Sequence, residues 1–480
     1  MHDLQKGLKN PKSRFSSWFS EIIARAGLAD MRYNVKGFLV HLPFSVKAMK
    51  AMYALYEAEL EAKGHKPCWF PAVIPESNFK VEKEHVEGFA PEVFWISEHG
   101  AGEKLTERIA LRPTSETGMY RMYGLWIRSW RDLPLKLYQS CQVWRWETKA
   151  TKPFIRGREF WWIEAHDAFA TEAEARAQVM EDMAMTENVM HREFGIPFIF
   201  FKRPEWDKFA GAVHTYAADS LMPDGRIIQQ PSTHFLGQNF SKPFKIKYVD
   251  KNGKKRYAWQ TCYGPCIWRM LASVIALHGD DKGLVFPFKI APIQVVIIPV
   301  SHDEVTINKC REIYSNLKSD FRTELDLSDA TPGWKFNEWE LKGAAIRVEI
   351  GQKEIKNKTI TLCRRDTRER ISVKEDQLKN KITELGDAIT ANLLKRADEW
   401  FFSMIKNAKN ISDVQRIKGG LIRVPWCSTD KDGIGCAEEL KDKFALHVRG
   451  ERIDKKEKPE GNCIICGRKA EHVVYVGKQY

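Results

Sequence analysis

Two stretches that mix aromatic and charged residues, 142–147 and 158–166, constrain the fold of this chain more than any other feature. Both have β-propensity, and side chains along a strand alternate between its two faces. The residues that share one face of the second stretch are Phe160, Trp162, Glu164 and His166. Burying an acid and an imidazole among rings costs free energy unless a partner or ligand meets them. With an apolar opposite face, the pattern predicts two paired strands with a binding site on one side.

The segment between these two arms is basic. The first arm places Arg145 and Glu147 on one face, and the linker carries Lys149, Lys152 and Arg156. Such a hairpin offers cations for phosphates beside a pocket of rings and acids. For any single residue an ordinary salt-bridged hairpin is the better interpretation. Seven such residues in phase on adjoining arms favour a site.

The composition is that of a globular protein with a cationic balance. Of 480 residues, 43% are hydrophobic and 29% charged, which allows two or three domains. The net charge of +13 favours a polyanionic partner, because Lys and Arg displace counterions from phosphates. No signal-like run opens the chain, its most apolar stretch (290–300) is too short to span a bilayer, and the ten cysteines lack a secreted framework. We therefore expect a soluble, cytoplasmic protein with no membrane partner.

Hydrophobic periodicity divides the chain into two kinds of region. From 219 to 283, strand-like runs alternate with turns, which predicts antiparallel sheet. Beyond residue 290 strands alternate with a helix, which argues for a separate α/β unit. The individual elements expected are helices at 18–26, 44–62, 304–317 and roughly 374–406, a capped helix after Thr171, and strands at 293–300, 346–350 and 359–363.

Several motifs resemble those of class II aminoacyl-tRNA synthetases. Residues 144–147 with 158–160 resemble their second signature motif, and the fuller string with 153–156 looks like that of prolyl-tRNA synthetases of the archaeal and eukaryotic type. The resemblance continues in the same order through 112–117, 234–240, 278–281 and the terminal Tyr480. It therefore covers nearly the whole chain.

The resemblance implies an α/β (α+β) architecture of three domains. Residues 1–286 would form a class II catalytic domain built on an antiparallel sheet. Residues 287–398 would form an anticodon-binding α/β domain, to which 339–351 are similar in sequence. Residues 399–480 would form a small zinc-binding C-terminal domain ending in Tyr480. In such enzymes the extended segment that begins at Phe70 builds the interface of a homodimer.

The activity that the resemblance implies is that of a proline–tRNA ligase (EC 6.1.1.15). L-Proline would be activated by ATP to prolyl-adenylate, and the prolyl group transferred to the 3′ end of tRNA(Pro). The attacking carboxylate is already ionised at neutral pH, so no strong general base is needed. The work is positioning and charge neutralisation, which calls for arginines and Mg²⁺.

The same resemblance assigns roles to individual residues. Arg145 and Arg269 would be the catalytic cations on opposite sides of the phosphates. The ATP-binding set is Arg145, Glu147, Arg156, Phe160, Gln229, Ser232 and Arg269. The proline-binding set is Thr114, Glu116, Arg145, Trp162, Glu164, His166, Phe209 and His234. Outside this pattern, either histidine would be taken for an ordinary hydrogen-bonded core histidine.

Four cysteines near the C-terminus suggest a structural metal. Cys463 and Cys466 form a C-x-x-C pair followed by glycine, and Cys427 and Cys436 form a second pair with eight residues between them. Two converging thiolate pairs on a small charged segment suit Zn²⁺, which can substitute for a larger core. The alternative is a set of unrelated buried cysteines, as we assume elsewhere in the chain.

Two rival functions and one expectation about accuracy remain. The fold could serve another amino acid (threonine, glycine or histidine), or a non-catalytic relative that binds RNA or regulates a partner. No Walker loop or dinucleotide fingerprint is present. Only about a hundred residues separate His166 from Gly264, so the large editing insertion of bacterial relatives is absent. We therefore expect misactivation of alanine and cysteine without editing in cis.

Overall fold

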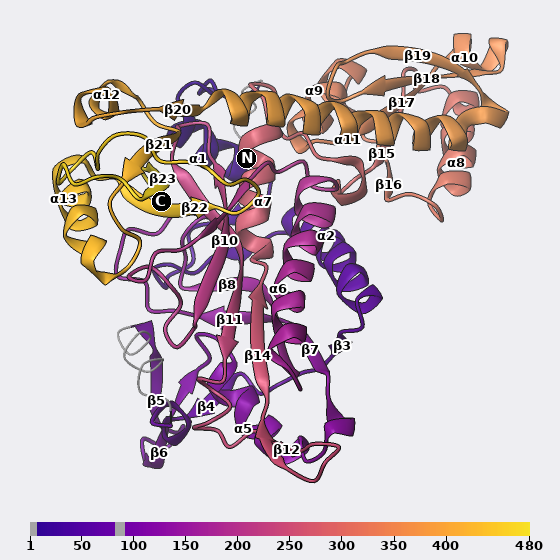
Figure 1. Cartoon of the computed structure of the whole chain (residues 1–480). Helices are drawn as coiled ribbons and strands as arrows, with labels where there is room; N and C mark the ends of the chain where they lie inside the picture. Colours follow the sequence, from indigo (N-terminus) through magenta and orange to yellow (C-terminus); the bar gives the residue numbers. More distant parts are fainter. Residues whose placement is uncertain (1–6, 82–91) are drawn as a thin grey trace. The chain divides into compact units, whose positions relative to one another are not determined.

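The computed structural model describes residues 7–81 and 92–480, coloured along the sequence in Figure 1. They form two compact units, each built from several stretches of chain. The larger unit holds residues 55–188, 198–269 and 401–480, and the smaller unit holds 189–197, 270–400 and the described residues up to 54. No helix in the described ranges has both the length and the apolar character to cross a bilayer.

An eleven-stranded sheet forms the larger unit (Figure 1). In spatial order its strands are β20 (Ile405–Asn407), β21 (Leu421–Trp426), β23 (His472–Gly477), β22 (His447–Arg452), β9 (Ile199–Lys202), β10 (His214–Leu221), β11 (Ile227–Gly237), β14 (Trp259–Gly264), β8 (Glu159–Phe169), β7 (Leu135–Trp144) and β3 (Lys66–Pro67). Only the outermost pair at each edge is parallel. The C-terminal strands join the rest where β22 pairs with β9.

The predicted strand pair is present as β7 and β8, in a register that opposes Trp144 to Glu159. The first arm is nevertheless shorter than expected, because the strand ends at Trp144 rather than at residue 147. The amide of Arg145 still bonds the carbonyl of Arg158 at 3.0 Å, but that of Trp146 bonds Glu92 at 2.8 Å. The chain therefore leaves the sheet there, and Arg145 and Glu147 lie in the loop beyond it.

Helices and smaller sheets complete the larger unit. Helix α6 (Glu172–Thr186) packs against β8, β11 and β14. It begins with the predicted capping box, in which Thr171 Oγ1 accepts from the Glu174 amide at 3.2 Å and the Glu174 carboxylate accepts from the Thr171 amide at 2.8 Å. The other elements are α3 (Glu76–Phe79), α5 (Glu116–Trp126), α12 (Ile411–Arg416), α13 (Ile434–Phe444), β4 (Val73–Pro75), β5 (Phe94–Glu98), β6 (Lys104–Leu111), β12 (Lys247–Val249) and β13 (Lys255–Tyr257).

The smaller unit carries the predicted α/β pattern. Its sheet runs β16 (Thr323–Leu325), β15 (Val295–Pro299), β17 (Ile346–Ile350), β18 (Thr359–Arg364) and β19 (Arg370–Lys374), with β15 parallel to both of its neighbours. Its helices are α8 (Glu304–Leu317), α9 (Pro332–Lys342) and α10 (Gln352–Asn357), and α1 (Phe15–Arg25) lies near a short pair of β1 (Ala29–Asp30) and β2 (Val40–His41). Helices α2 (Pro43–Ala62), α7 (Ile267–His278) and α11 (Leu378–Ser403) run from one unit into the other.

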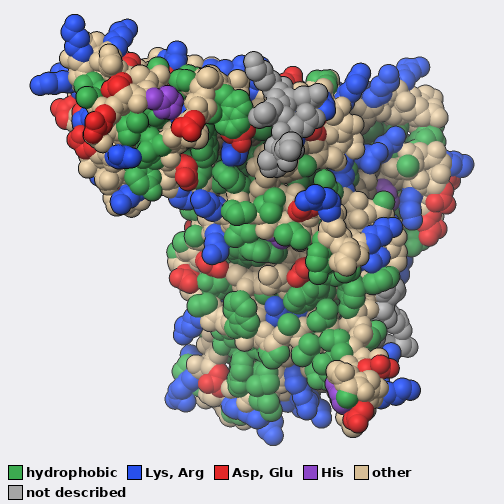
Figure 2. All heavy atoms as spheres, turned by 180° about the vertical axis from the view of Figure 1, so that it is seen from behind, with side chains coloured by type: hydrophobic (Ala, Val, Ile, Leu, Met, Phe, Trp, Pro, Cys, Tyr) green, Lys and Arg blue, Asp and Glu red, His purple; other side chains and the backbone are tan. Residues whose placement is uncertain are grey.

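Large apolar side chains are exposed on the larger unit. Figure 2 shows one face of the molecule on which hydrophobic side chains gather over the lower part of the view. The most exposed large apolar side chain is Trp69, just after β3, at 77%, and Leu125 and Trp126 at the end of α5 are exposed at 53% and 46%. Exposed apolar surface of this kind often marks a contact with another molecule.

Candidate active site

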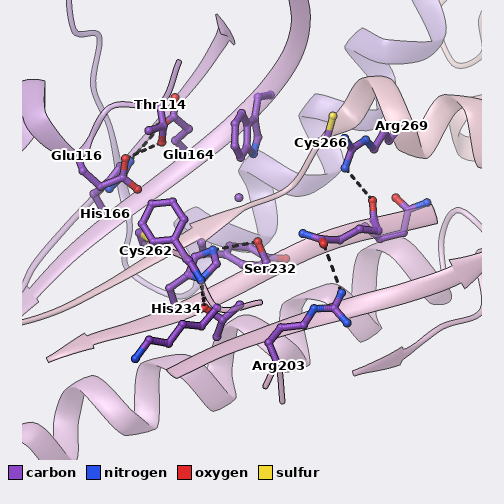
Figure 3. Close-up of a pocket in the computed structure, with 18 of the residues that line it drawn as sticks. Thr114, Glu116, Glu164, His166, Arg203, Ser232, His234, Cys262, Cys266 and Arg269 are labelled. Atoms are coloured by element: carbon purple, nitrogen blue, oxygen red, sulfur yellow. Dashed lines mark hydrogen bonds and ion pairs between the residues drawn. The ribbon is translucent and has the colours of Figure 1, made fainter. Parts of the chain in front are cut away.

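One cavity of about 190 Å³ opens in the larger unit beside β8, β10, β11 and β14 (Figure 3). It brings together every residue predicted to bind proline and all but two of those predicted to bind ATP. Those that line it are Thr114, Glu116, Arg145, Phe160, Trp162, Glu164, His166, Phe209, Gln229, Ser232, His234 and Arg269. The face of β8 that the sequence pattern predicted to form a binding site is thus the face that lines the cavity.

The inner end of the cavity is acidic. Thr114 Oγ1 donates to Glu116 at 2.6 Å, and the amide and hydroxyl of Ser115 donate to Glu164 at 2.9 and 3.0 Å. The chain can place Glu116 here because it opens helix α5, where the helix dipole favours a carboxylate. All these side chains are buried, so each carboxyl depends on such donors.

His166 shares this end of the cavity, with Nε2 3.1 Å from Glu164 and Nδ1 3.2 Å from the Tyr120 hydroxyl. Burial alone would raise the pKa of Glu164, but hydrogen bonding and attraction from His166 outweigh it and the pKa lies below the usual value. Burial likewise opposes the imidazolium, yet the nearby carboxylates raise the pKa of His166. Two carboxyl groups therefore lie beside one imidazole and favour its charged form, an environment that also suits a cationic ligand such as an ammonium.

A metal ion fits this end less well. Ligand atoms of Glu116, His166 and Cys262 lie within 4.8 Å of one another. Both ring nitrogens of His166 are already engaged, however, and burial raises the pKa of the Cys262 thiol. A metal would have to displace protons from both groups.

Two arginines also line the cavity. Arg145 Nε donates to the Pro113 carbonyl at 3.0 Å, and its guanidinium lies 4.8 Å from the centre of the Trp162 ring. Arg269, in the first turn of α7, donates to the Gln229 carbonyl at 3.2 Å. Burial lowers the pKa of both guanidinium groups, which still stay charged. Fixed, half-buried cations of this kind suit an anionic ligand.

Glu147 and Arg156 lie outside the cavity lining. They form an ion pair of 2.7 Å, and Arg156 Nη2 also donates to the main-chain oxygen of Tyr480 at 2.5 Å. Lys152, in the same basic linker, lies 5.2 Å from the centre of the Tyr480 ring. The linker therefore meets the last residue of the chain beside the site.

Sequence reasoning missed several residues that line the cavity. They are Arg203, Asp207, Lys208, Thr215, Gln230, Cys262, Tyr263, Gly264 and Cys266. Strand register could have found two of them, because Thr215 is directly opposite His234 and Cys262 is opposite His166. At Gly264 a Cβ atom would lie 2.6 Å from the Trp162 ring, so only glycine lets that ring take its place.

Behind the cavity, a buried carboxylate joins the catalytic strands to the C-terminal strands. Asp219 on β10 accepts two hydrogen bonds of 2.8 Å from Arg203 and bonds of 2.8 and 3.0 Å from Arg449 on β22. All three side chains are at most 4% exposed. Arg203 also reaches the Gln229 side chain at 3.3 Å, so the network touches the cavity wall.

The four predicted zinc ligands converge in the C-terminal part of the larger unit. Sulfur atoms of Cys427, Cys436, Cys463 and Cys466 all lie within 4.8 Å of one another. Burial opposes a thiolate at Cys466, but hydrogen bonds from Arg468 lower its pKa to about 6. Four converging sulfurs, one of them readily ionised, fit a tetrahedral Zn²⁺.

Three segments of the chain match known protein families. Residues 94–278 match the tRNA synthetase class II core domain (G, H, P, S and T), 294–385 match an anticodon binding domain, and 413–480 match the prolyl-tRNA synthetase C-terminal family. The core is therefore that of a class II aminoacyl-tRNA synthetase.

Relatives that match the chain over its full length show to which family within this class it belongs. The chain is 51% identical to a proline–tRNA ligase of Thermofilum pendens, over 99% of this chain and all of the relative, and 43% identical to that of Pyrococcus abyssi over 98% and 99%. It is also similar to a solved prolyl-tRNA synthetase of Giardia lamblia in complex with prolyl-adenylate, with a TM-score of 0.93 and 36% identity over 99% of this chain and all of that one. The chain belongs to the prolyl-tRNA synthetase family.

Proposed function

We propose that the chain activates L-proline with ATP and transfers the prolyl group to the 3′ end of tRNA(Pro). The carrying observation is one cavity whose lining combines carboxyl groups, arginines and aromatic rings. An amino acid needs a carboxylate partner for its ammonium and a cation for its carboxylate. The rings of Trp162 and Phe209 in the same lining suit an apolar cyclic side chain.

In the first step, a carboxylate oxygen of proline attacks the α-phosphorus of ATP and the bond to the β-phosphate breaks. Pyrophosphate leaves and prolyl-adenylate remains. Arg145 and Arg269 stabilise the charge that develops on the phosphate, since preorganised donors are strongest where charge appears. When bound, Mg²⁺ would neutralise the ATP phosphates. In the second step a hydroxyl of the terminal adenosine attacks the prolyl carbonyl and AMP leaves.

The remaining roles follow the same arrangement. Glu116, Thr114 and Glu164 would hold the ammonium, with His166 fixing Glu164. Phe160 would stack on the adenine, while Gln229 and Ser232 contact the nucleotide. Glu147 and Arg156 would meet the adenine amino group and the terminal phosphates when ATP is present, and their ion pair holds the basic linker beside the cavity.

Amino-acid-dependent exchange between ATP and pyrophosphate tests this function. We expect exchange with proline far above that with the other nineteen amino acids. A preference for threonine, glycine or histidine would show that the same fold serves another amino acid. Binding of tRNA without any exchange would support a non-catalytic relative.

Zinc at the four cysteines is the next proposal. We expect about one zinc ion per chain by elemental analysis, and less after Cys463→Ser, because a tetrahedral site loses a ligand. Cys310→Ser, at a buried cysteine of the smaller unit, is the matched control and should leave the zinc content unchanged. A wild-type chain purified without chelator that carries no zinc would contradict the site.

We further propose a homodimer and three domains with boundaries at 286 and 398. Exposed Trp69, Leu125 and Trp126 support a contact with a second copy, since apolar surface of this size is costly to leave in water. The mass measured by light scattering tests the dimer. Limited proteolysis tests the boundaries.

Misactivation of alanine and cysteine is the finer part of the proposal. A pocket sized for the proline ring cannot exclude smaller residues sterically, and each missing methylene costs a competitor only about 1–3 kcal/mol. Elements α6 to β14 fill the chain between His166 and Gly264, which supports the absence of an editing insertion there. We expect preformed Ala-tRNA(Pro) to persist when mixed with the enzyme. Deacylation well above the rate in enzyme-free buffer would contradict this.

A further inference from the structure

Thr215 contacts two side chains that wall one side of the cavity. Its Oγ1 accepts a hydrogen bond of 2.8 Å from the Phe209 amide and lies 2.9 Å from His234 Nδ1. The Phe209 and His234 rings lie 4.5 Å apart, and His234 Nε2 lies 3.0 Å from Ser232 Oγ (Figure 3). Four residues from β10, β11 and the loop before β10 thus form one chain of contacts.

The protonation state of His234 follows from the hydrogen bonds that its neighbours make. Burial, with the charges of His166 and Arg203, lowers the pKa of His234 to about 3, so the ring is neutral and one nitrogen must accept. Thr215 Oγ1 already accepts from the Phe209 amide. The hydroxyl hydrogen of Thr215 needs an acceptor, and His234 Nδ1 lies within reach of it. Nε2 then carries the proton and donates to Ser232. In the opposite tautomer the Thr215 hydrogen would have no acceptor among the described residues.

One consequence concerns Ser232. Its oxygen accepts from His234, and no other side-chain hydrogen bond joins Ser232 to the described residues, so its own hydrogen is available. Ser232 lines the cavity and is only 7% exposed. A hydroxyl that must donate into the cavity suits a phosphate or carboxylate oxygen and disfavours a second donor.

We propose that Thr215 is a positioning residue for the reaction, acting through His234 to make Ser232 a donor to the nucleotide and through Phe209 to hold the wall beside the proline ring. This inference rests on the proposed function. It adds a cavity-lining residue to which the sequence assigned no role and which controls two separate properties, the affinity for ATP and the discrimination between proline and smaller amino acids.

Two variants at one position separate the hydroxyl from its bulk. Thr215→Val keeps the shape and removes the hydroxyl, and Thr215→Ser keeps the hydroxyl. We expect Thr215→Val to lower kcat/KM for proline roughly tenfold or more in pyrophosphate exchange, because two buried groups lose their partner. We expect the preference for proline over alanine to fall with it. Thr215→Ser should stay within about threefold of wild type on the same principle.

A double-mutant cycle identifies the route. Thr215→Val should raise the KM for ATP, and that increase should vanish in a Ser232→Ala background, since the serine is the proposed intermediary. The loss of preference for proline should persist there, because it runs through Phe209. Equal behaviour of the Val and Ser variants, or additive effects on the ATP KM, would overturn the proposal. Absence of proline-dependent exchange in the wild type would instead overturn the proposed function.

Nitrogen-15 NMR of histidine tests the tautomer without altering Thr215. The His234 signals are found by their loss in His234→Gln. Because the pKa of His234 is about 3, we expect a neutral ring with the proton on Nε2 at neutral and mildly acidic pH. A proton on Nδ1, or titration near neutral pH, would refute the proposed chain of hydrogen bonds even if Thr215→Val fails to fold.

Discussion

Replacing Arg145 by Ala is expected to slow formation of prolyl-adenylate roughly 10²-fold or more. The guanidinium is half-buried, held by the Pro113 carbonyl and placed over the Trp162 ring, so its position in the cavity wall is fixed. Its loss removes a cation where charge develops in the transition state. Pyrophosphate exchange at saturating proline measures the effect on kcat.

Arg145→Lys and Arg131→Ala are the comparison variants. Lys keeps the charge and loses the planar fork, so its exchange rate should lie between those of wild type and Arg145→Ala. Arg131 is exposed and does not line the cavity, so its replacement should leave exchange unchanged. Exchange within threefold of wild type for Arg145→Ala would reject its catalytic role.

Patterns within single strands and helices predicted part of the site. The alternation along 158–166 identified the face of β8 that meets the cavity, and the capping box after Thr171 marked the start of α6. Both depend on neighbours in sequence, where geometry repeats every two or about four residues. The prediction for the first arm was wrong beyond Trp144, where the strand ends. The Trp146 amide there bonds the carbonyl of Glu92, which belongs to a distant segment of the chain.

Contacts across strands were not predictable in this way. Thr215 reaches His234 only because β10 and β11 pair in one particular register, and a shift of one residue would turn it to the other face. Cys262 meets His166 for the same reason. The motif resemblance assigned the residues that we propose to contact substrates, whereas the neighbours that contact those residues across strands became visible only in the fold.

The buried carboxylate of Asp219 illustrates the same limit and leads to the largest expected effect on stability. Its partner Arg449 follows 230 residues later and belongs to a different predicted domain. Asp219→Ala leaves two buried guanidinium groups without their shared counter-ion, a loss of about 3–5 kcal/mol by analogy with other broken buried pairs. We expect a lower urea midpoint and faster protease cleavage beyond residue 400, because Arg449 anchors β22 beside β9.

Acid should reproduce part of this loss in the wild type. Burial alone would raise the pKa of Asp219, but Arg203 and Arg449 outweigh it and the pKa lies below the usual value. A depressed pKa means that this stabilisation is fully present above the unfolded value of about 4 and disappears as pH falls through the lower folded value. Asp219→Asn should therefore show a weaker loss of stability on acidification than the wild type.

Asp454→Ala is the matched control for the buried triad. Asp454 pairs with Arg452, on the same strand as Arg449, but its carboxylate is exposed. An exposed pair contributes about 0–1 kcal/mol, so this variant should unfold close to wild type. If Asp219→Ala unfolds no earlier than Asp454→Ala, the triad does not hold the C-terminal strands to the catalytic sheet. The pairing of β22 with β9, only two residues long, would then have to hold that junction without the ionic anchor.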